Sequence, residues 1–182
     1  LAILAGEYFW VLRDNTRYFD LSDFGHSLQI THSPDERGIN VALLYQRGIF
    51  KLLSNRSYPV MKPRRNSRPT PDILHVSGQL LTTDPLDVFV VHFPSRSGGA
   101  KASEPYRLAA AQRLKDTTDS LLRIRTRPQI IIMGDFNDYP DNKSIQKILK
   151  AGIPPTETDS VDSRPLYHLL ARKGIDNKHF GS

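Results

Sequence analysis

The chain has 182 residues, of which 38% are hydrophobic and 24% charged. This length allows one globular domain with a sizeable core and is short for two, and the composition does not indicate disorder. No apolar run approaches the roughly 20 residues of a membrane-spanning helix, and the net charge of +6 fits a phosphate-bearing partner as well as ordinary solubility.

Cysteine is absent, which excludes disulfides, thiolate metal sites and a cysteine nucleophile. The compartment stays open, because cytosolic, periplasmic and secreted proteins can all lack cysteine. The chain starts at Leu1 in an apolar stretch without an initiator Met or a signal peptide. We therefore expect the natural protein to begin further upstream. Its localisation is unknown, and a periplasmic or secreted protein would require a signal peptide in that upstream part.

The first part of the chain predicts a strand, a helix and a second strand. Residues 1–5 read as the end of a buried strand, Val11 to Phe19 as a short helix, and Ser27 to Thr31 as a brief strand. Glu7 follows the first strand, where it is either a metal ligand or a solvated turn carboxylate.

A hairpin is predicted next. From Ile39 to Tyr45 nearly every residue is apolar, so both faces of this strand should be covered. Phe50 to Val60 is its expected antiparallel partner, because the link Gln46-Arg47-Gly48 is hairpin-sized. Residues Arg56 to Arg68 then hold five cations and two prolines, which predict an exposed basic loop. This loop is either simply solvated or a contact for a phosphate backbone.

A second strand pair is predicted from Ile73 to Leu81 and from Leu86 to Phe93. The second strand ends at His92, which is either a structural histidine or part of a site. A loop rich in Gly and Ser follows, and it carries Arg96 and Lys101, whose side chains suit an anionic oxygen.

A long helix connects this pair to the next strand. Ser103 is the expected N-cap, and the helix should run to about Arg125. Its apolar stripe comprises Ala111, Leu114, Thr118 and Leu121. Arg107 falls near this stripe, where a structural ion pair is one interpretation. Strand, helix and strand predict parallel neighbours, whereas the hairpins predict antiparallel ones, so the sheet should be mixed.

The next strand, opened by Pro128, runs through Ile130-Ile131-Ile132-Met133 and ends abruptly at Gly134-Asp135-Phe136-Asn137. It reads as a buried strand followed by a polar turn. Side chains alternate along a strand, so Asp135 and Asn137 should project the same way at its carboxyl end. Open α/β sheets place their ligands at such ends.

The last part of the chain predicts two short helices. Asp141 or Asn142 should cap a helix from Lys143 to Lys150, and Gly152 should end it. A loop from Ile153 to Pro165 should lead to a helix from Leu166 to Arg172.

Four features in this order resemble the endonuclease/exonuclease/phosphatase superfamily, the family of deoxyribonuclease I. They are His92, Pro94-Ser95-Arg96-Ser97-Gly98-Gly99, Arg107 and Gly134-Asp135-Phe136-Asn137-Asp138. The run from Ser33 to Tyr45, which includes Asp35-Glu36-Arg37-Gly38, is similar to a hallmark of the bacterial members. The resemblance implies an α/β fold, a sandwich of two mixed β-sheets flanked by helices. Residues 1–182 would form a single domain of this type that is incomplete at both ends.

The resemblance also implies a chemistry and its residues. Family members hydrolyse phosphate esters with a divalent metal, so Mg²⁺ or Mn²⁺ is the expected cofactor and a phosphate ester the expected partner. Asp135 would orient or deprotonate the attacking water, Asn137 would hold Asp135 and a phosphate oxygen, and His92 would bind phosphate or assist the leaving group. Tyr45, Arg96 and Arg107 would bind the substrate.

The chain departs from the family pattern at the metal site. By spacing, Ala5 stands where the family has its metal-binding Glu, and Glu7 two residues later is the candidate replacement. This chain also lacks the family's upstream Asn and downstream Asp-His pair. The sequence thus leaves open a metal-dependent phosphodiesterase or phosphatase, the same enzyme weakened or inactive, and a non-catalytic module that binds phosphate or nucleic acid.

Overall fold

The computed structural model describes residues 2–6, 25–35, 38–65, 69–80, 85–153 and 166–169. The chain divides into two compact units, Leu1–Asn137 and Asp138–Ser182. That residues 1–182 form a single domain stays a prediction. Within the described ranges, no helix is long and apolar enough to cross a bilayer.

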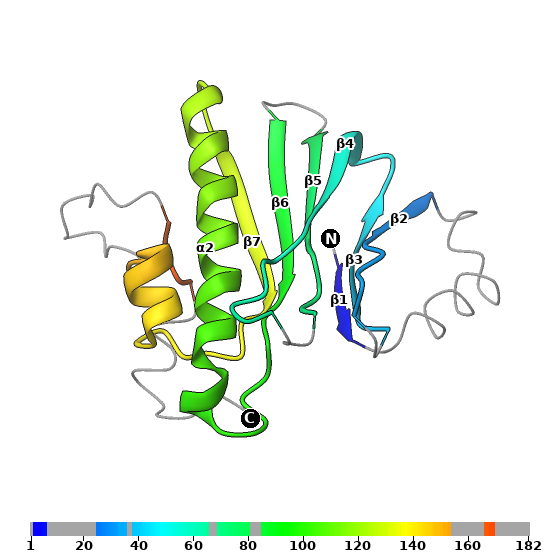
Figure 1. Cartoon of the computed structure of the whole chain (residues 1–182). Helices are drawn as coiled ribbons and strands as arrows, with labels where there is room; N and C mark the ends of the chain where they lie inside the picture. The colour runs from blue at the N-terminus through cyan, green and yellow to red at the C-terminus, as the bar shows by residue number, and fades with distance from the viewer. Residues whose placement is uncertain are drawn as a thin grey trace. The chain divides into compact units, whose positions relative to one another are not determined.

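Two sheets form the first unit (Figure 1). The three-stranded sheet has the order β1-β3-β2, and the four-stranded sheet has the order β4-β5-β6-β7. Their strands are β1 (Ala2–Gly6), β2 (His26–Ile30), β3 (Asn40–Gln46), β4 (Phe50–Tyr58), β5 (Ile73–Leu80), β6 (Pro85–His92) and β7 (Gln129–Asp135). All described pairs are antiparallel except β6 with β7, which is parallel. The four-stranded sheet is therefore mixed, as the crossover predicted, whereas the described three-stranded sheet is purely antiparallel and not mixed as the family resemblance implied.

The predicted hairpin between the third and fourth strands is wrong. β3 already pairs with β1 on one edge and β2 on the other, so no edge remains for β4. The short turn at residues 47–49 instead carries the chain into the other sheet, where β4 pairs with β5. The predicted basic loop also begins later than expected, because Arg56 belongs to β4 and lies opposite His75.

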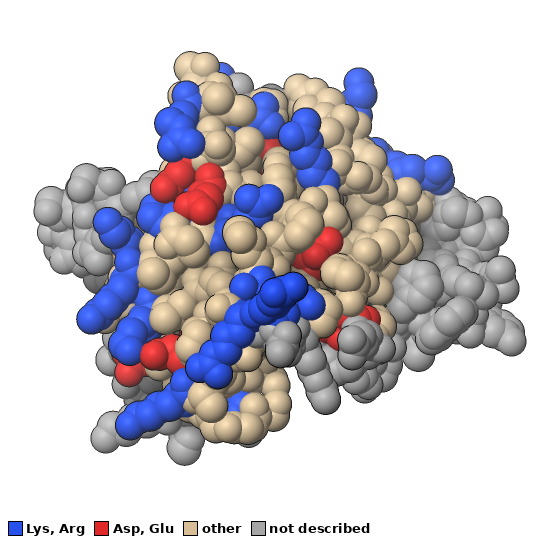
Figure 2. Space-filling view, in the orientation of Figure 1, with Lys and Arg blue, Asp and Glu red and all other residues tan. Residues whose placement is uncertain are grey.

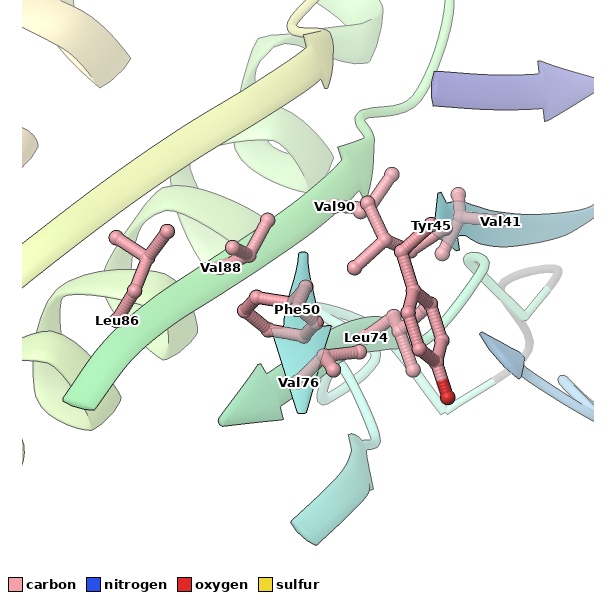
Figure 3. Close-up of a cluster of buried hydrophobic side chains, with 9 residues drawn as sticks. Val41, Tyr45, Phe50, Leu74, Val76, Leu86, Val88 and Val90 are labelled. Carbon is pink, nitrogen blue, oxygen red and sulfur yellow. The ribbon is translucent and has the colours of Figure 1, made fainter. Parts of the chain in front are cut away.

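The hydrophobic core lies between the two sheets (Figure 3). The buried members of its central cluster are Val41, Leu43, Tyr45, Phe50, Leu74, Val76, Leu86, Val88 and Val90. Side chains from β3 meet side chains from β5 and β6 in this cluster, and the ring of Tyr45 contacts that of Phe50 edge-to-face at 5.4 Å between centroids. This shared burial holds the sheets together as a sandwich.

Helix α2 (Ala100–Ile124) makes the predicted crossover between β6 and β7. The predicted stripe is confirmed, since Ala111, Leu114, Thr118 and Leu121 are all buried. The N-cap is Gly99 rather than Ser103, and the Ser103 hydroxyl donates to the Gly99 carbonyl at 2.8 Å. The hydroxyl therefore bonds back along the helix instead of starting it. β7 is the outermost described strand of its sheet, with Ile131 39% exposed, and not the fully buried strand that was predicted.

The described part of the second unit differs from the predicted helices. η1 (Ser144–Leu149) is a π-helix whose N-cap, Lys143, makes no side-chain capping bond. Lys150 takes the left-handed conformation (φ 55°) expected of Gly152 and ends the helix. Gly152 forms a parallel bridge with Tyr167, so the first residues of the predicted last helix are extended. The predicted helix from Val11 to Phe19 lies outside the described residues.

A buried ion pair fastens the end of α2 to the start of β6. Asp87 is fully buried and accepts hydrogen bonds from the Arg125 guanidinium at 2.9 and 3.0 Å. The Nε2 atom of His75 lies 2.9 Å from the same carboxylate, and Arg125 also donates to Ser77 at 3.0 Å. Burial alone would raise the pKa of Asp87, but the hydrogen bonds from Arg125, His75 and Ser77 outweigh it and hold the pKa below its usual range. Burial lowers the pKa of His75.

Replacement of Arg125 tests this ion pair. We expect Arg125→Met to lower the free energy of unfolding at pH 7 by about 3 kcal/mol, because Asp87 would remain as a buried charge without its cation. The loss should shrink on acidification, since the stabilising contribution of Asp87 exists above its unfolded pKa and disappears as the pH falls through the lowered folded value. Urea unfolding measures both effects. The control is Arg123→Met, an exposed change in the last turn of α2. It should alter the free energy of unfolding by no more than about 0.5 kcal/mol.

Candidate phosphate-ester site

Two of the predicted catalytic residues lie side by side at the ends of neighbouring parallel strands. His92, the last residue of β6, is the register partner of Asp135, the last residue of β7. The backbone N–H of Phe93 donates to the Asp135 carbonyl at 2.8 Å, which continues the pairing beyond the strand end. His92 is half-buried and Asp135 is exposed. The parallel crossover thus presents an imidazole and a carboxylate at one edge of the sheet.

Asn137 is fixed by a turn and not by strand alternation, because β7 ends at Asp135. Its backbone N–H donates to the Asp135 carboxylate at 2.8 Å, and its side-chain amide donates to the Phe93 carbonyl at 2.9 Å. Its φ of 49° lies in the left-handed region, which Asn tolerates better than most residues. A carbonyl can only accept, so the amide nitrogen must face Phe93. This leaves the second amide hydrogen and the amide oxygen of Asn137 for other partners.

Gly134 allows the two strands to approach closely enough for this geometry. Its φ is 130°, and a Cβ at this position would lie 1.9 Å from the Val91 carbonyl oxygen. Both facts exclude any other residue without a backbone shift. The close approach is set one residue before His92 and Asp135 and therefore fixes the start of the site.

The loop after β6 is attached to the same turn. Arg96 donates through Nε to the Asn137 carbonyl at 2.9 Å, and the hydroxyls of Ser95 and Ser97 lie 2.6 Å apart. The rings of Phe93 and Phe136 pack edge-to-face at 5.1 Å. Among the predicted site residues, the structure therefore brings together His92, Asp135, Asn137 and Arg96.

The other predicted residues have different surroundings. Tyr45 is 4% exposed and packs in the core against Phe50. Arg107 is 2% exposed and donates to the Ser103 hydroxyl at 2.8 Å and to the Ala100 carbonyl at 3.0 Å. Glu7 lies outside the described residues. The substrate-binding roles of Tyr45 and Arg107 and the metal-binding role of Glu7 stay predictions.

Hydrogen bonds connect the three-stranded sheet to the end of the four-stranded sheet at which this site lies. The backbone N–H of Asp72 donates to the Ser33 hydroxyl at 2.9 Å, and the Ser33 N–H donates to the Asn40 side chain at 2.8 Å. Asn40 begins β3 and is the partner of Gly6, the last residue of β1. β1 therefore ends at Gly6, and the hydrogen bonds of Ser33 connect its partner Asn40 to Asp72.

Asp72 is a candidate site residue that the sequence analysis missed. The β5–β6 pairing sets Leu74 opposite Val90, and the same register extended by two residues sets Asp72 opposite His92. Asp72 is 6% exposed, and burial raises the pKa of its carboxyl. Within the described residues, Asp72 Oδ1 and His92 Nδ1 are both buried without a hydrogen-bond partner. Two such atoms at one strand end indicate groups that a ligand or water would satisfy. The sequence signal was a carboxylate directly before a strand whose partner ends at His92.

The donor set fits a phosphate ester and part of a magnesium site. Carboxylate and amide oxygens are the ligands that Mg²⁺ prefers, whereas imidazole and guanidinium suit phosphate oxygens. The described ranges hold no cluster of three or more His, Asp or Glu residues that could bind a metal ion. A complete metal site would therefore need a ligand from outside them.

Substitution of Gly134 tests the close approach. We expect Gly134→Ala to lower the free energy of unfolding by about 3 kcal/mol, because the new Cβ would combine an unfavourable φ with a clash against Val91. Urea unfolding measures the change. Gly48→Ala is the matched control, since a Cβ at Gly48 would meet no atom within 4 Å. Equal effects of the two substitutions would contradict the proposed constraint.

The Asp72 carboxyl gives a pH-dependent prediction. Its pKa is raised on folding, so its stabilising contribution is complete below the ordinary value of 3.8 and is lost as the pH rises through the folded value. We therefore expect Asp72→Asn to raise the Tm at pH 7.5 and to leave it nearly unchanged near pH 4. Differential scanning calorimetry measures both, with the exposed Asp141→Asn as control. A lower Tm at pH 7.5 would mean that a cation neutralises Asp72 in the folded chain.

Comparisons with known proteins identify the family and support the fold. The model of the "Endonuclease/Exonuclease/phosphatase family" matches residues 7–180. No curated protein matches the sequence significantly. The human Nocturnin catalytic domain with bound sulfate is similar in structure, with a TM-score of 0.63, 16% identity, and coverage of 79% of this chain and 53% of that chain.

Two further solved structures are similar. ANGEL2, a 2',3'-cyclic phosphatase in complex with adenosine-2',3'-vanadate, has a TM-score of 0.57 and 18% identity over 76% of this chain and 41% of that chain. TDP2 from D. rerio, complexed with a single-strand DNA product, has a TM-score of 0.52 and 10% identity over 74% and 47%. The chain thus spans about half the length of these structures, and identities this low show the fold alone. The family match covers nearly the whole sequence, and the chain belongs to the endonuclease/exonuclease/phosphatase family.

Proposed function

We propose that this chain is a metal-dependent phosphoric ester hydrolase of the phosphodiesterase type. The observation that carries the proposal is the alignment of His92 with Asp135 at adjacent parallel strand ends. Asn137 is fixed between them by hydrogen bonds to Asp135 and Phe93. The similarity to ANGEL2, a 2',3'-cyclic phosphatase, and to TDP2 in complex with a single-strand DNA product supports this class, and the run from Ser33 to Tyr45 supports a bacterial origin.

Each residue has a role that its environment allows. Asp135 is exposed and can orient or deprotonate the attacking water, while the N–H of Asn137 holds one of its oxygens in place. The second amide hydrogen of Asn137 can donate to a phosphate oxygen. His92 can bind that phosphate or donate a proton to the leaving oxygen, and Arg96 adds positive charge beside Asn137.

The metal ion would neutralise the charge that develops on the phosphate oxygens. Glu7 is the carboxylate that we propose to hold it, because β1 ends at Gly6 and pairs there with Asn40. Ala5 stands at the position that carries this ligand elsewhere in the family, which favours a weakened metal site. No step assigned to His92, Asp135 or Asn137 depends on the geometry of the metal.

The second candidate is a non-catalytic module that binds phosphate or nucleic acid on the same fold. It is favoured by Ala5 and by the exposed cations of the β4–β5 loop, and it predicts binding without turnover. Hydrolysis that depends on Asp135 would exclude it.

Turnover of an activated diester separates the two candidates. We expect the full chain to hydrolyse bis(p-nitrophenyl) phosphate in the presence of Mg²⁺ or Mn²⁺, and Asp135→Ala and His92→Ala each to lower kcat by about 10²- to 10⁴-fold, because each loses a proton-transfer group. Lys51→Gln, an exposed change at the opposite end of β4, should keep the full rate.

Circular dichroism and Tm should confirm that all three variants are folded. Absence of turnover with Mg²⁺, Mn²⁺ and other divalent metals would overturn the hydrolase proposal. A rate that survives both Asp135→Ala and His92→Ala would do the same, because a contaminant would then account for it.

A further inference from the structure

The β4–β5 loop, residues 59–72, lies at the same end of the four-stranded sheet as the proposed site in its described parts, residues 59–65 and 69–72. It leaves β4 at Tyr58, the partner of Ile73 at the start of β5. β5 begins where β6 ends, because Leu74 pairs with Val90. In Figure 1 this connection, in teal, turns near the lower end of the four-stranded sheet, where the arrows of β6 and β7 also end.

The loop carries a concentrated positive charge. It holds Lys62, Arg64, Arg65 and Arg68, whereas its first acidic residue is Asp72 at the very end. The chain has a net charge of +6, and the four cations and one carboxylate of this loop give +3, which is half of that excess. Lys62, Arg64 and Arg65 are exposed, and within the described residues none of them makes an ion pair. Figure 2 shows a cluster of Lys and Arg side chains at the centre of the face it presents, where Figure 1 draws this loop.

The loop is held in place by buried residues on both sides of its exposed cations. Val60 is 9% exposed and Thr70 is 7% exposed, so the chain is buried on either side of the charged tip. The N–H of Asp72 donates to the hydroxyl of Ser33, in the connection between β2 and β3, at 2.9 Å. A loop held at both ends loses less conformational entropy on binding than a free one.

A second group of cations lies across the site. Arg96 is fixed to the Asn137 carbonyl at 2.9 Å, and Lys101 is exposed in the first turn of α2. One phosphate ester at His92 and Asp135 could use Arg96 alone. Cations on the β4–β5 loop and in the segment from Arg96 to Lys101 instead match a chain of phosphates that continues past the scissile one.

An anionic membrane is a weaker match for the same charges. Binding at a bilayer surface normally joins cations to a sizeable apolar face. In the described part of the loop, Met61 is the one large apolar side chain that is strongly exposed. A single methionine gives little apolar area for insertion, so the charges favour a soluble polyanion.

We propose that the β4–β5 loop binds the phosphodiester backbone of a nucleic acid strand whose scissile phosphate lies at His92 and Asp135. This inference rests on the proposed function and names its substrate class. Arg64 and Arg65 are the main contacts, and they act without reading the bases.

The test measures binding of a fluorescein-labelled single-stranded DNA 20-mer by anisotropy. The full chain carries Asp135→Ala, so that turnover cannot deplete the probe, and NaCl is varied from about 50 to 200 mM, the range over which several phosphate contacts produce a large change. We expect Arg64→Gln/Arg65→Gln to raise Kd about tenfold at low salt. The slope of log Kd against log salt should also fall by about 1 to 1.5, because each lost contact on a single strand contributes roughly 0.7.

The matched control is Lys51→Gln/Arg123→Gln, which removes the same charge from exposed positions at the other end of the unit. Lys51 pairs with Gln79 near the end of β5, and Arg123 is in the last turn of α2. Its Kd and salt slope should stay close to those of the parent. Equal effects of the two double variants would overturn the inference, because net charge and not the loop would then control binding.

Two further outcomes separate this inference from the proposed function. If the unmodified chain hydrolyses bis(p-nitrophenyl) phosphate but does not bind the DNA probe, the inference fails and the hydrolase proposal stands. Binding that depends on Arg64 and Arg65 without any turnover supports the loop contact and overturns the hydrolase proposal. Tighter binding to phosphatidylserine vesicles than to DNA would overturn the nucleic acid as substrate.

Discussion

The site depends on the close parallel approach of β6 and β7 at Gly134. Without a side chain at this residue, the backbone of β7 can lie against the Val91 carbonyl, and His92 then pairs directly with Asp135. The turn that follows uses the same alignment, since Asn137 bonds both the Asp135 carboxylate and the Phe93 carbonyl. Backbone pairing therefore sets the relative position of the candidate residues His92 and Asp135, and the hydrogen bonds of the turn set that of Asn137.

Much of the fold could be predicted from periodicity and from the order of elements. The buried stripe of α2 and the parallel crossover follow from residue spacing, because a long helix between two strands can return the chain to the same edge. The β3–β4 hairpin could not be predicted, since the turn at residues 47–49 is short enough for a hairpin and sequence does not show that both edges of β3 are occupied. The assignment of β3 and β4 to different sheets depends on pairing between strands that are far apart in the sequence.

The site was predictable to a similar degree. His92 and Asp135 stand directly at strand ends, where local pattern identifies them. The placement of Asn137 required a left-handed turn that strand alternation does not describe. Asp72 could not be predicted as a site residue, because its position opposite His92 follows from the β5–β6 register and not from any sequence motif. Local sequence therefore identified the residues whose position is local, and the non-local one needed the structure.

Two buried aspartates, Asp87 in β6 and Asp72 directly before β5, differ in how their charge is satisfied. At one end of the four-stranded sheet, Asp87 is surrounded by Arg125, His75 and Ser77, and its pKa is lowered. At the other end, Asp72 is buried with its pKa raised by burial alone. A carboxylate whose charge is already satisfied holds the helix to the sheet and has little capacity to bind anything else. An unsatisfied one costs stability, and that cost is reduced when a cation, a protonated group or an ordered water reaches the strand ends. The end of the sheet that contains His92 and Asp135 is thus the end at which a ligand would contribute most to the stability of the folded chain.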